Sequence, residues 1–457
     1  MEIVLLALGA ALSAALLAGL AGSASTWKTR RRRRDAWAAA VAVCGLPVDE
    51  RFDPWGSQRQ IQAWVGPLEV RVEDAGRHTR VVAVVPDHPE ISHVKIRRHR
   101  LKPPEPEIEI GDEPFDRAFH VVGPLWLLCV LLDAETRSLL LKVSTEISLE
   151  IAHGELRAEM PNRQLSAVLP LLLAIGQRLA RPLNAAQRLA ENVRNDPAAG
   201  VRLLNLLSLL SEHPGDRETV ETLRAACSDA IPQIRLRAAL GLGAEGRAVL
   251  AALAESAEDD AVSARSVSLL GRELPIERAR DILDHALRNR HLQTGRACLE
   301  QLARGGDPAD VDVLAQVMAG ETGELATAAA LALGSLGSPA AEPPLIQALQ
   351  REPEDLQVAA ATALGRVGTT AAVLSLEEAV ERFPHNPDLP KAALQAIAAI
   401  QSRLPGASPG QLSLAGADVG NLSFAQAEGG ELSIATDPVG RLSLSGGEEA
   451  GGETSED

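Results

Sequence analysis

The sequence contains few aromatic residues and no tyrosine. Aromatic residues make up 2% of the 457 residues, so leucine, alanine and valine must form most of the core. Such a composition favours packed helices, because sheets are enriched in aromatic and β-branched residues. The four cysteines lie far apart in apolar contexts, which predicts buried free thiols and no disulfide framework.

Several short motifs that are typical of metal-binding, phosphate-binding or catalytic sites are also missing. The sequence has no CxxC pair, no HExxH motif, no glycine-rich phosphate loop and no GxSxG. We therefore expect no metal and no cofactor. The net charge of −16 argues against binding DNA or RNA through the bulk of the chain, since phosphate contacts need a basic surface.

The N-terminus combines a long apolar run with a basic block. Residues 3–24 carry no charge and are numerous enough to span a bilayer as a transmembrane helix. Residues 25–35 form a basic juxtamembrane segment. The residues expected at the membrane interface are Trp27, Lys28, Arg30, Arg31, Arg32, Arg33 and Arg34.

The position of the basic block relative to the apolar run predicts the orientation of the chain in the membrane. Because the basic block follows the apolar run, the positive-inside rule predicts a single-pass bacterial inner-membrane protein with its N-terminus outside and the bulk of the chain cytoplasmic. The arginines would also attract anionic membrane lipid. Two alternatives are a signal peptide cleaved near Ala21–Ser25 and a nucleic-acid role for the arginine run.

Residues 36–182 have the pattern of an α+β domain. Period-2 alternation predicts strands over 60–65, 68–73, 79–85, 94–101 and 107–110, and a hairpin over 144–151 and 155–160. Asp133 is placed to cap a helix that runs to Leu141, and residues 164–180 are expected to form a helix that Pro170 interrupts.

One motif stands out inside this domain, at residues 110–121 with the sequence IGDEPFDRAFHV. It resembles a G-D-x-x-F-D-x-x-F-x-V pattern of uncharacterised membrane-anchored bacterial proteins, a resemblance that implies no known activity. Asp112, Asp116 and His120 are weak candidates for a metal or acid–base site. The alternative is that Phe115 and Phe119 are core anchors and the polar residues cap a turn.

Residues 183–404 repeat a short sequence pattern about every 31 residues, a period typical of helical repeats. AAALALGSLG at 328–337 recurs as AAATALGRVG at 359–368, with weaker copies before and after. The repeat-defining residues are Leu333, Gly334, Gly337, Leu364, Gly365 and Gly368. A fixed period of this length predicts an α-solenoid of stacked helix hairpins, in which Gly337 and Gly368 end the first helix as left-handed caps.

This pattern resembles HEAT repeats, in particular the short bacterial type named from phycobilin lyases. The resemblance implies a scaffold that binds protein partners and has no enzymatic activity. Two enzyme families on this scaffold fit less well: the HEAT-like hydroxylases use His-Glu dipeptides, which are missing, and bilin lyases stack a tetrapyrrole on aromatic residues, of which the array has only Phe383. The acidic balance of the array argues against the HEAT-like DNA glycosylases.

Residues 405–457 form an acidic, low-complexity tail in which GxLS recurs from Gly410, Gly420, Gly430 and Gly440. Its composition predicts disorder. The four Leu-Ser-Leu/Phe/Ile segments are either a low-complexity repeat that has drifted without a function, or weak docking motifs that add a strand to a partner's sheet.

Together these parts predict a mostly α fold: a transmembrane helix, a small α+β domain, a HEAT-like solenoid and a tail. The predicted function is a membrane-anchored scaffold that binds protein partners through the array and the tail. The alternatives are a bilin-lyase-type enzyme, a hydrolytic site within 112–120 and a purely structural envelope protein.

Overall fold

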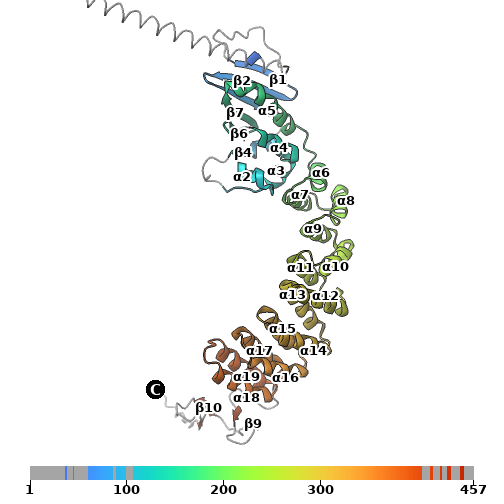
Figure 1. Cartoon of the computed structure of the whole chain (residues 1–457), viewed down its shortest axis with the longest axis vertical. Helices are drawn as coiled ribbons and strands as arrows, with labels where there is room; N and C mark the ends of the chain where they lie inside the picture. The colour runs from blue at the N-terminus through green and yellow to red at the C-terminus, as the bar shows by residue number, and fades with distance from the viewer. Residues whose placement is uncertain are drawn as a thin grey trace, which may run out of the picture. The chain divides into compact units, whose positions relative to one another are not determined.

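The structure is a computed structural model that describes residues 37–38, 45, 60–85, 89–98, 106–143 and 145–403, together with four short strands within 412–446 (Figure 1). The chain divides into two compact units, Met1–Gly246 and Arg247–Asp457. The first unit contains a sheet and several helices, and the second contains most of the helical repeats.

A seven-stranded antiparallel sheet organises the first unit. Its strands in chain order are β1 (Gln60–Val65), β2 (Leu68–Ala75), β3 (His78–Val84), β4 (Lys95–Arg98), β5 (Phe119–Val122), β6 (Ser148–Ala152) and β7 (Glu155–Pro161). Their order across the sheet is β1-β2-β3-β7-β6-β4-β5.

Alternation along the strands explains the core of this sheet. Leu68, Val70 and Val72 of β2 are buried, while the residues between them are only partly covered. The helix α5 (Leu165–Leu179) packs on β3 and β7. The predicted strands at 60–65 and 155–160 are confirmed to within a residue. The predicted strand at 107–110 is wrong, because this stretch is not a strand of the sheet, although the Ile108 N–H donates to the Val121 carbonyl at 3.0 Å.

Three short helices complete the sheet region: α2 (Glu113–Ala118), α3 (Leu125–Leu131) and α4 (Ala134–Lys142). The predicted cap of α4 is confirmed, since the Asp133 carboxylate accepts a hydrogen bond from the Thr136 N–H at 2.9 Å. Two 3₁₀ turns, η1 (Pro89–His93) and η2 (Asn162–Gln164), lead into β4 and α5.

Four further helices belong to the first unit: α6 (Ala185–Asn195), α7 (Ala199–Glu212), α8 (Arg217–Ala226) and α9 (Pro232–Leu242), with the 3₁₀ turn η3 (Gly243–Gly246) after them. The helix α3 joins them to the sheet. Its Cys129 and Val130 are buried in one cluster with Leu189 of α6 and Leu206 of α7. The helix α3 therefore contributes residues to two apolar clusters, one beneath the sheet and one among these helices.

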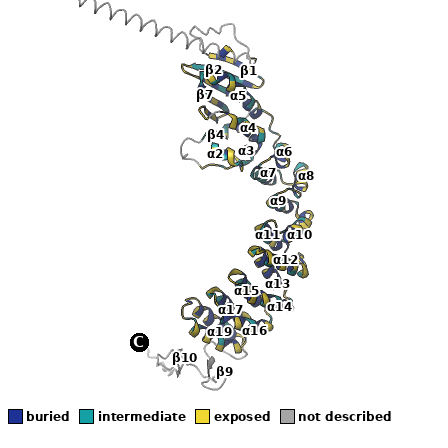
Figure 2. Cartoon of the chain, viewed as in Figure 1, coloured by how far each residue is buried: buried dark blue, intermediate teal, exposed yellow. Residues whose placement is uncertain are grey.

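The second unit is a row of helices: α10 (Arg247–Glu255), α11 (Asp260–Leu270), α12 (Ile276–Asn289), α13 (Leu292–Gly305), α14 (Asp310–Gly320), α15 (Glu324–Leu336), α16 (Glu342–Leu349), α17 (Glu354–Val367), α18 (Ala371–Arg382) and α19 (Leu389–Ser402), with 3₁₀ turns η4 (Gly271–Glu273) and η5 (Pro339–Ala341). The odd-numbered helices α11 to α19 each pack on the next, and α12, α14 and α16 each pack on the helix that comes after them. Buried residues lie between the helices and exposed residues outside them (Figure 2).

The predicted fold class is wrong in two respects. Within the described ranges, no helix is both long and apolar enough to cross a membrane. The longest, α5, has 15 residues where about 20 are needed. The N-terminal part also contains a seven-stranded antiparallel sheet, which the predicted fold class did not include.

The predicted localisation is corrected by the same finding. A single-pass inner-membrane protein needs a spanning helix, and the described part of the chain provides none. The predicted helix at 3–24 and the basic segment at 25–35, with Trp27, Lys28 and the arginines, lie outside the described residues.

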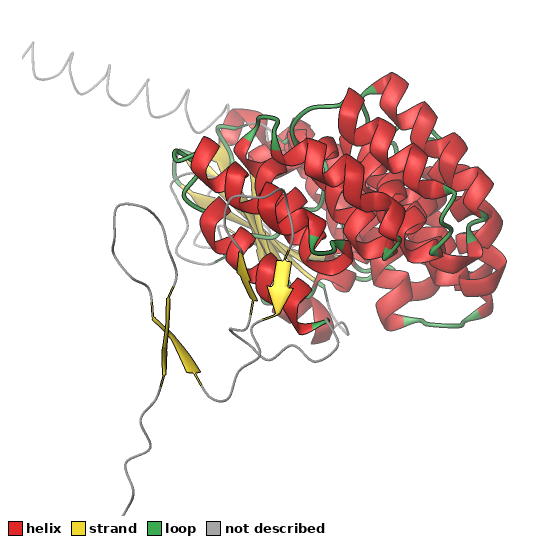
Figure 3. Cartoon of the chain, turned by 90° about the horizontal axis from the view of Figure 1, so that it is seen from below, coloured by secondary structure: helices red, strands yellow, loops and turns green. Residues whose placement is uncertain are grey.

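Four short strands are described in the tail that was predicted to be disordered. They are β8 (Leu412–Leu414), β9 (Leu422–Phe424), β10 (Gly430–Ser433) and β11 (Ser443–Gly446). They form two separate antiparallel pairs, β8 with β9 and β10 with β11 (Figure 3). Each pair joins two successive GxLS repeats.

Candidate protein-binding surface

The motif at 110–121 forms α2 and the start of β5. Phe115 and Phe119 are buried at 0% and 1% exposure, and their rings stack with centroids 5.0 Å apart. Both phenylalanines belong to the core of the sheet region. This placement agrees with the interpretation of these residues as core anchors.

The three polar candidates of the motif bind protein groups. The Asp116 carboxylate accepts hydrogen bonds from the N–H groups of Ile110, Gly111 and Asp112 at 3.0 to 3.1 Å. Burial raises the pKa of Asp116, although these hydrogen bonds oppose the shift. His120 is 2% exposed on β5, opposite Arg97 of β4. No group of three or more His, Cys, Asp or Glu residues placed to hold a metal ion occurs among the described residues.

The third candidate, Asp112, belongs to a buried charge cluster. Arg137 of α4 donates from Nε to the Asp112 carboxylate at 2.6 Å, and from Nη1 and Nη2 to both oxygens of Asp196 at 2.9 Å. Arg137 and Asp196 are 2% and 4% exposed. Asp196 follows α6, so this arginine ties the sheet region to the helices α6 and α7.

A direct contact of two backbones lies beside this cluster. Gly111 has φ +83°, and a Cβ on it would lie 2.5 Å from the carbonyl carbon of Gly200 in α7. Equally, a Cβ on Gly200 would lie 2.5 Å from the Gly111 oxygen. Only glycine fits at either position. We call Gly111, Asp112, Arg137, Asp196 and Gly200 the joint.

The same charge pattern continues into the next helices. Arg202 of α7 binds both carboxylate oxygens of Asp229 at 2.9 Å. Arg202 also donates to the Asp196 carbonyl, and Arg235 donates in the same way to the Asp229 carbonyl, so the Asp–Arg pair recurs one repeat later. Arg137 therefore forms with Asp196 the same bidentate ion pair that Arg202 forms with Asp229. In this respect the sheet region takes the position that a preceding repeat would have.

The repeat-defining residues pack α15, α17 and α19 together. Leu333 and Leu364 are buried. A Cβ on Gly334 would lie 2.6 Å from Cα of Ala363, and one on Gly365 would lie 3.0 Å from Cα of Ala396. The two glycines therefore allow successive helices to approach closely.

The two predicted caps differ. Gly337 is left-handed at φ 74°, which confirms the prediction for this residue. Gly368 has φ −65° and is not left-handed, so the prediction for it is wrong. A Cβ there would lie 2.6 Å from the Leu364 oxygen, so close packing requires this glycine.

The outer face of these three helices carries exposed apolar side chains. Leu331 of α15 is 40% exposed and Leu394 of α19 is 69% exposed. The helix α17 packs between α15 and α19, and its Thr362 is also exposed. One turn further on, Arg366 donates to Ser335 of α15 at 2.8 Å. We call Leu331, Thr362, Leu394 and the exposed Ala398 the exposed patch.

The corresponding face of α13 is different. Its exposed residues include Arg296, Glu300 and Arg304, and Glu300 forms ion pairs with both arginines. A charged face of this kind is ordinary for a solvated helix. The uncharged exposed patch therefore sets the C-terminal end of the array apart from α13.

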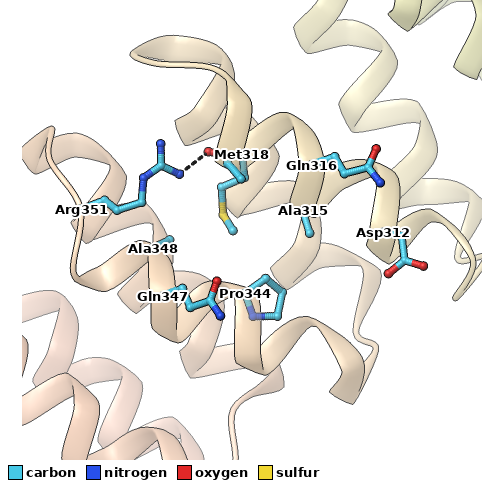
Figure 4. Close-up of a pocket in the computed structure, with 9 residues that line it drawn as sticks. Asp312, Ala315, Gln316, Met318, Pro344, Gln347, Ala348 and Arg351 are labelled. Carbon is cyan, nitrogen blue, oxygen red and sulfur yellow. Dashed lines mark hydrogen bonds between the residues drawn. The ribbon is translucent and has the colours of Figure 1, made fainter.

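A groove lies on the other side of the row, between α14 and α16 (Figure 4). It has a volume of about 480 Å³ and an apolar floor that includes Ala315, Pro344 and Ala348. Asp312 lies at one end, and at the other Arg351 donates to the Met318 carbonyl at 2.8 Å.

Comparison with known families identifies the repeat. Residues 318–398 match the family model for HEAT repeats. No curated protein matches the chain. The matched HEAT repeats run from the end of α14 through most of α19, and so include Leu331, Thr362 and Leu394. HEAT repeats are helical scaffolds that generally mediate protein–protein interactions.

Sequence reasoning missed Arg137, Asp196 and Gly200. A signal was present in the Asp–Arg spacing, which is the same at Asp196 and Arg202 as at Asp229 and Arg235. Arg137 has no such partner in its own segment, and only the packing of α4 against α6 and α7 makes its role visible. The exposed patch was missed because the glycine and alanine pattern describes contacts inside the array.

Proposed function

We propose that this chain is a HEAT-repeat scaffold that binds a protein partner across the exposed patch. The observation that carries the proposal is the exposure of Leu331 on α15 and Leu394 on α19, with the uncharged Thr362 exposed on α17 between these helices. Apolar side chains that gather exposed on one face of a domain are typical of interaction sites. Gly334 and Gly365 allow each of these helices to pack closely on the next, which keeps the patch rigid. A rigid surface loses less conformational entropy on binding.

The joint supports a structural role for the motif at 110–121. Asp112 and Asp116 already bind Arg137 and backbone N–H groups, so we assign them to holding the sheet region onto α6 and α7. No catalytic step is part of the proposal.

The test is a comparison of binding by variants of the full chain. Partners are captured from an extract of the source cells, identified by mass spectrometry, purified and titrated by calorimetry. Leu331→Lys with Leu394→Lys is expected to weaken binding by at least about tenfold, because two charges would lose water at an apolar contact. Ser268→Lys, on the exposed face of α11, is the matched control.

The proposal fails if the double lysine variant binds the purified partner as tightly as the unchanged chain. Binding that is lost equally with Ser268→Lys would point to a general charge effect instead of a contact at the exposed patch.

A further inference from the structure

The helix α19 is the last helix of the row in the described part of the chain (Figure 1). It packs on α17 at Ala396, since a Cβ on Gly365 would lie 3.0 Å from Cα of Ala396. Likewise α17 packs on α15 at Ala363, which faces Gly334. Ala363 and Ala396 are therefore equivalent, and each residue of α19 corresponds to the residue of α17 that is 33 positions earlier.

This correspondence identifies the side of α19 that a further helix would cover. Ala330 of α15 and Ala361 of α17 each precede by one turn the glycine that meets the next helix, and both are buried at 0% exposure. Their counterpart in α19 is Leu394, which is 69% exposed, and the counterpart of Gly365 is the exposed Ala398. Leu394 and Ala398 therefore lie where the exposed patch meets the end of the row.

The helix α18 is also less covered than its counterparts. Met318 of α14, Leu349 of α16 and Val380 of α18 follow one another at the period of 31 residues. Met318 and Leu349 are buried, whereas Val380 is half-buried. In the last hairpin of the array, which consists of α18 and α19, the face that earlier repeats bury is therefore partly exposed.

Two carboxylates lie beside Val380. Ala315 and Ala319 of α14 line the groove between α14 and α16, and two periods later their counterparts are Glu377 and Glu381. Burial and, to a smaller extent, the charge of Glu381 raise the pKa of Glu377. Within the described ranges, neither glutamate forms an ion pair. We call Glu377, Glu381, Leu394 and Ala398 the open end.

We propose that a helix hairpin of the protein partner docks on the open end and takes the place of the next repeat. The inference rests on the proposed function for the existence of the partner, and it names the element that the partner contributes. Helical repeats bury an apolar face against their neighbours, and an array normally ends in a repeat with a polar outer face. Leu394 and Ala398 depart from this rule, so the surface that joins α15 to α17 and α17 to α19 continues past the last helix.

The chemistry of the open end defines the occupant. Leu394 is larger than the alanines at the equivalent positions of α15 and α17, so the incoming helix needs glycine or alanine opposite it. The two glutamates attract lysine or arginine of the second helix of the hairpin. A second copy of this chain fits less well, because its own open end would bring two further carboxylates into the contact.

Photo-crosslinking of the full chain tests where the partner lies. The probe is the partner purified for the calorimetric titration. Ala398→p-benzoylphenylalanine is expected to crosslink to a segment of this partner that carries glycine or alanine at helical spacing. The same substitution at Ser268, on the exposed face of α11, is the control and is expected to give no crosslink to the partner. Crosslinks to a segment without this spacing, crosslinks only between copies of this chain, or none at all overturn the proposal.

A matched pair of charge variants tests the electrostatic part. Glu381→Lys reverses a charge of the open end, while Glu378→Lys makes the same change at another exposed position of α18. Glu378 directly follows Glu377 and so points about 100° away from it around the helix. In calorimetric titrations, Glu381→Lys is expected to weaken binding of the partner about threefold to tenfold, and Glu378→Lys by less than about twofold. Equal affinities of the two variants contradict the inference.

Leu331→Lys separates this inference from the proposed function, because Leu331 belongs to the exposed patch but not to the open end. Loss of partner binding in Leu331→Lys, with equal affinities of Glu381→Lys and Glu378→Lys, leaves the scaffold function standing and removes the inference. Weaker binding by Glu381→Lys, with no effect of Leu331→Lys, supports docking at the open end and removes Leu331 from the binding surface.

Discussion

The attachment of the sheet to α6 and α7 and the stacking of α15, α17 and α19 depend on different contacts. In the first unit, Arg137 joins Asp112 and Asp196 in a cluster of buried charges. In the second, α15, α17 and α19 meet through Gly334, Gly365 and the alanines that face them. Buried charges are satisfied in one arrangement only, so they fix where the sheet attaches. Contacts between small residues can be repeated, so they extend the row of helices.

Arg137→Met is expected to have the largest effect. It leaves Asp196 buried without its bidentate partner, which costs about 3–5 kcal/mol of unfolding free energy. All five tryptophans precede residue 247, so urea unfolding followed by tryptophan fluorescence reports on the first unit.

Arg217→Met is the control for this variant. Arg217 is 92% exposed and pairs with Glu221 one turn away, so its loss is expected to change stability by less than about 0.5 kcal/mol. Similar losses in the two variants would contradict the role given to the joint.

Gly334→Ala is expected to destabilise the second unit by about 1–3 kcal/mol, because its Cβ would meet the backbone of Ala363 at 2.6 Å. Gly320→Ala, also in a helix but with nothing within 4 Å of an added Cβ, is expected to be neutral or slightly stabilising. Circular dichroism at increasing urea concentration measures the stability of both variants. An unchanged stability of Gly334→Ala would show that the close approach of α15 and α17 does not stabilise the row of helices.

Acid is expected to weaken the first unit through Asp229. Burial alone would raise the pKa of Asp229, but hydrogen bonds from Arg202 and from the Ile231 N–H lower it. A lowered folded-state pKa stabilises the fold above the ordinary value of about 3.9, and this stabilisation is lost as the pH falls through the folded-state pKa. The stability difference between the unchanged chain and Asp229→Asn should therefore shrink from pH 6 to pH 3, as measured by urea titrations. A constant difference would contradict this role of the carboxylate.

The smallest effect is expected for Leu394→Lys. A side chain that is 69% exposed contributes little to the core, so unfolding free energy should change by less than about 0.5 kcal/mol. Thermal unfolding followed by circular dichroism measures this, and a larger loss would show that Leu394 supports the packing of α19.

The sequence predicted the elements whose pattern is local. Alternation predicted β1 and β7, Asp133 predicted the start of α4, and the period of the array predicted the stacking at Gly334 and Gly365. Each of these depends on residues that are neighbours in the chain or recur at a fixed interval. The strand β5 was not predicted, because Phe119, His120 and Val121 are all buried and show no alternation.

The binding surface was harder to predict than the fold. Arg137 and Asp196 are 59 residues apart and come together only through the packing of α4 on the helices α6 and α7. Leu331 and Leu394 look like core residues in sequence, since the positions of the repeat around them are mostly apolar or small. Leu331 and Leu394 are exposed because they lie on the sides of α15 and α19 that do not pack against other helices.

The way α15, α17 and α19 pack also bears on how the chain can change in evolution. Each of these helices packs along its row only on its immediate neighbours, and α15 and α17 carry nearly the same sequence pattern. An in-frame duplication of one whole repeat there would insert one more helix hairpin and widen the outer face by one helix diameter. Such a change leaves Arg137 and Gly111 untouched, so the length of this array can vary between descendants while the sheet stays attached in the same way.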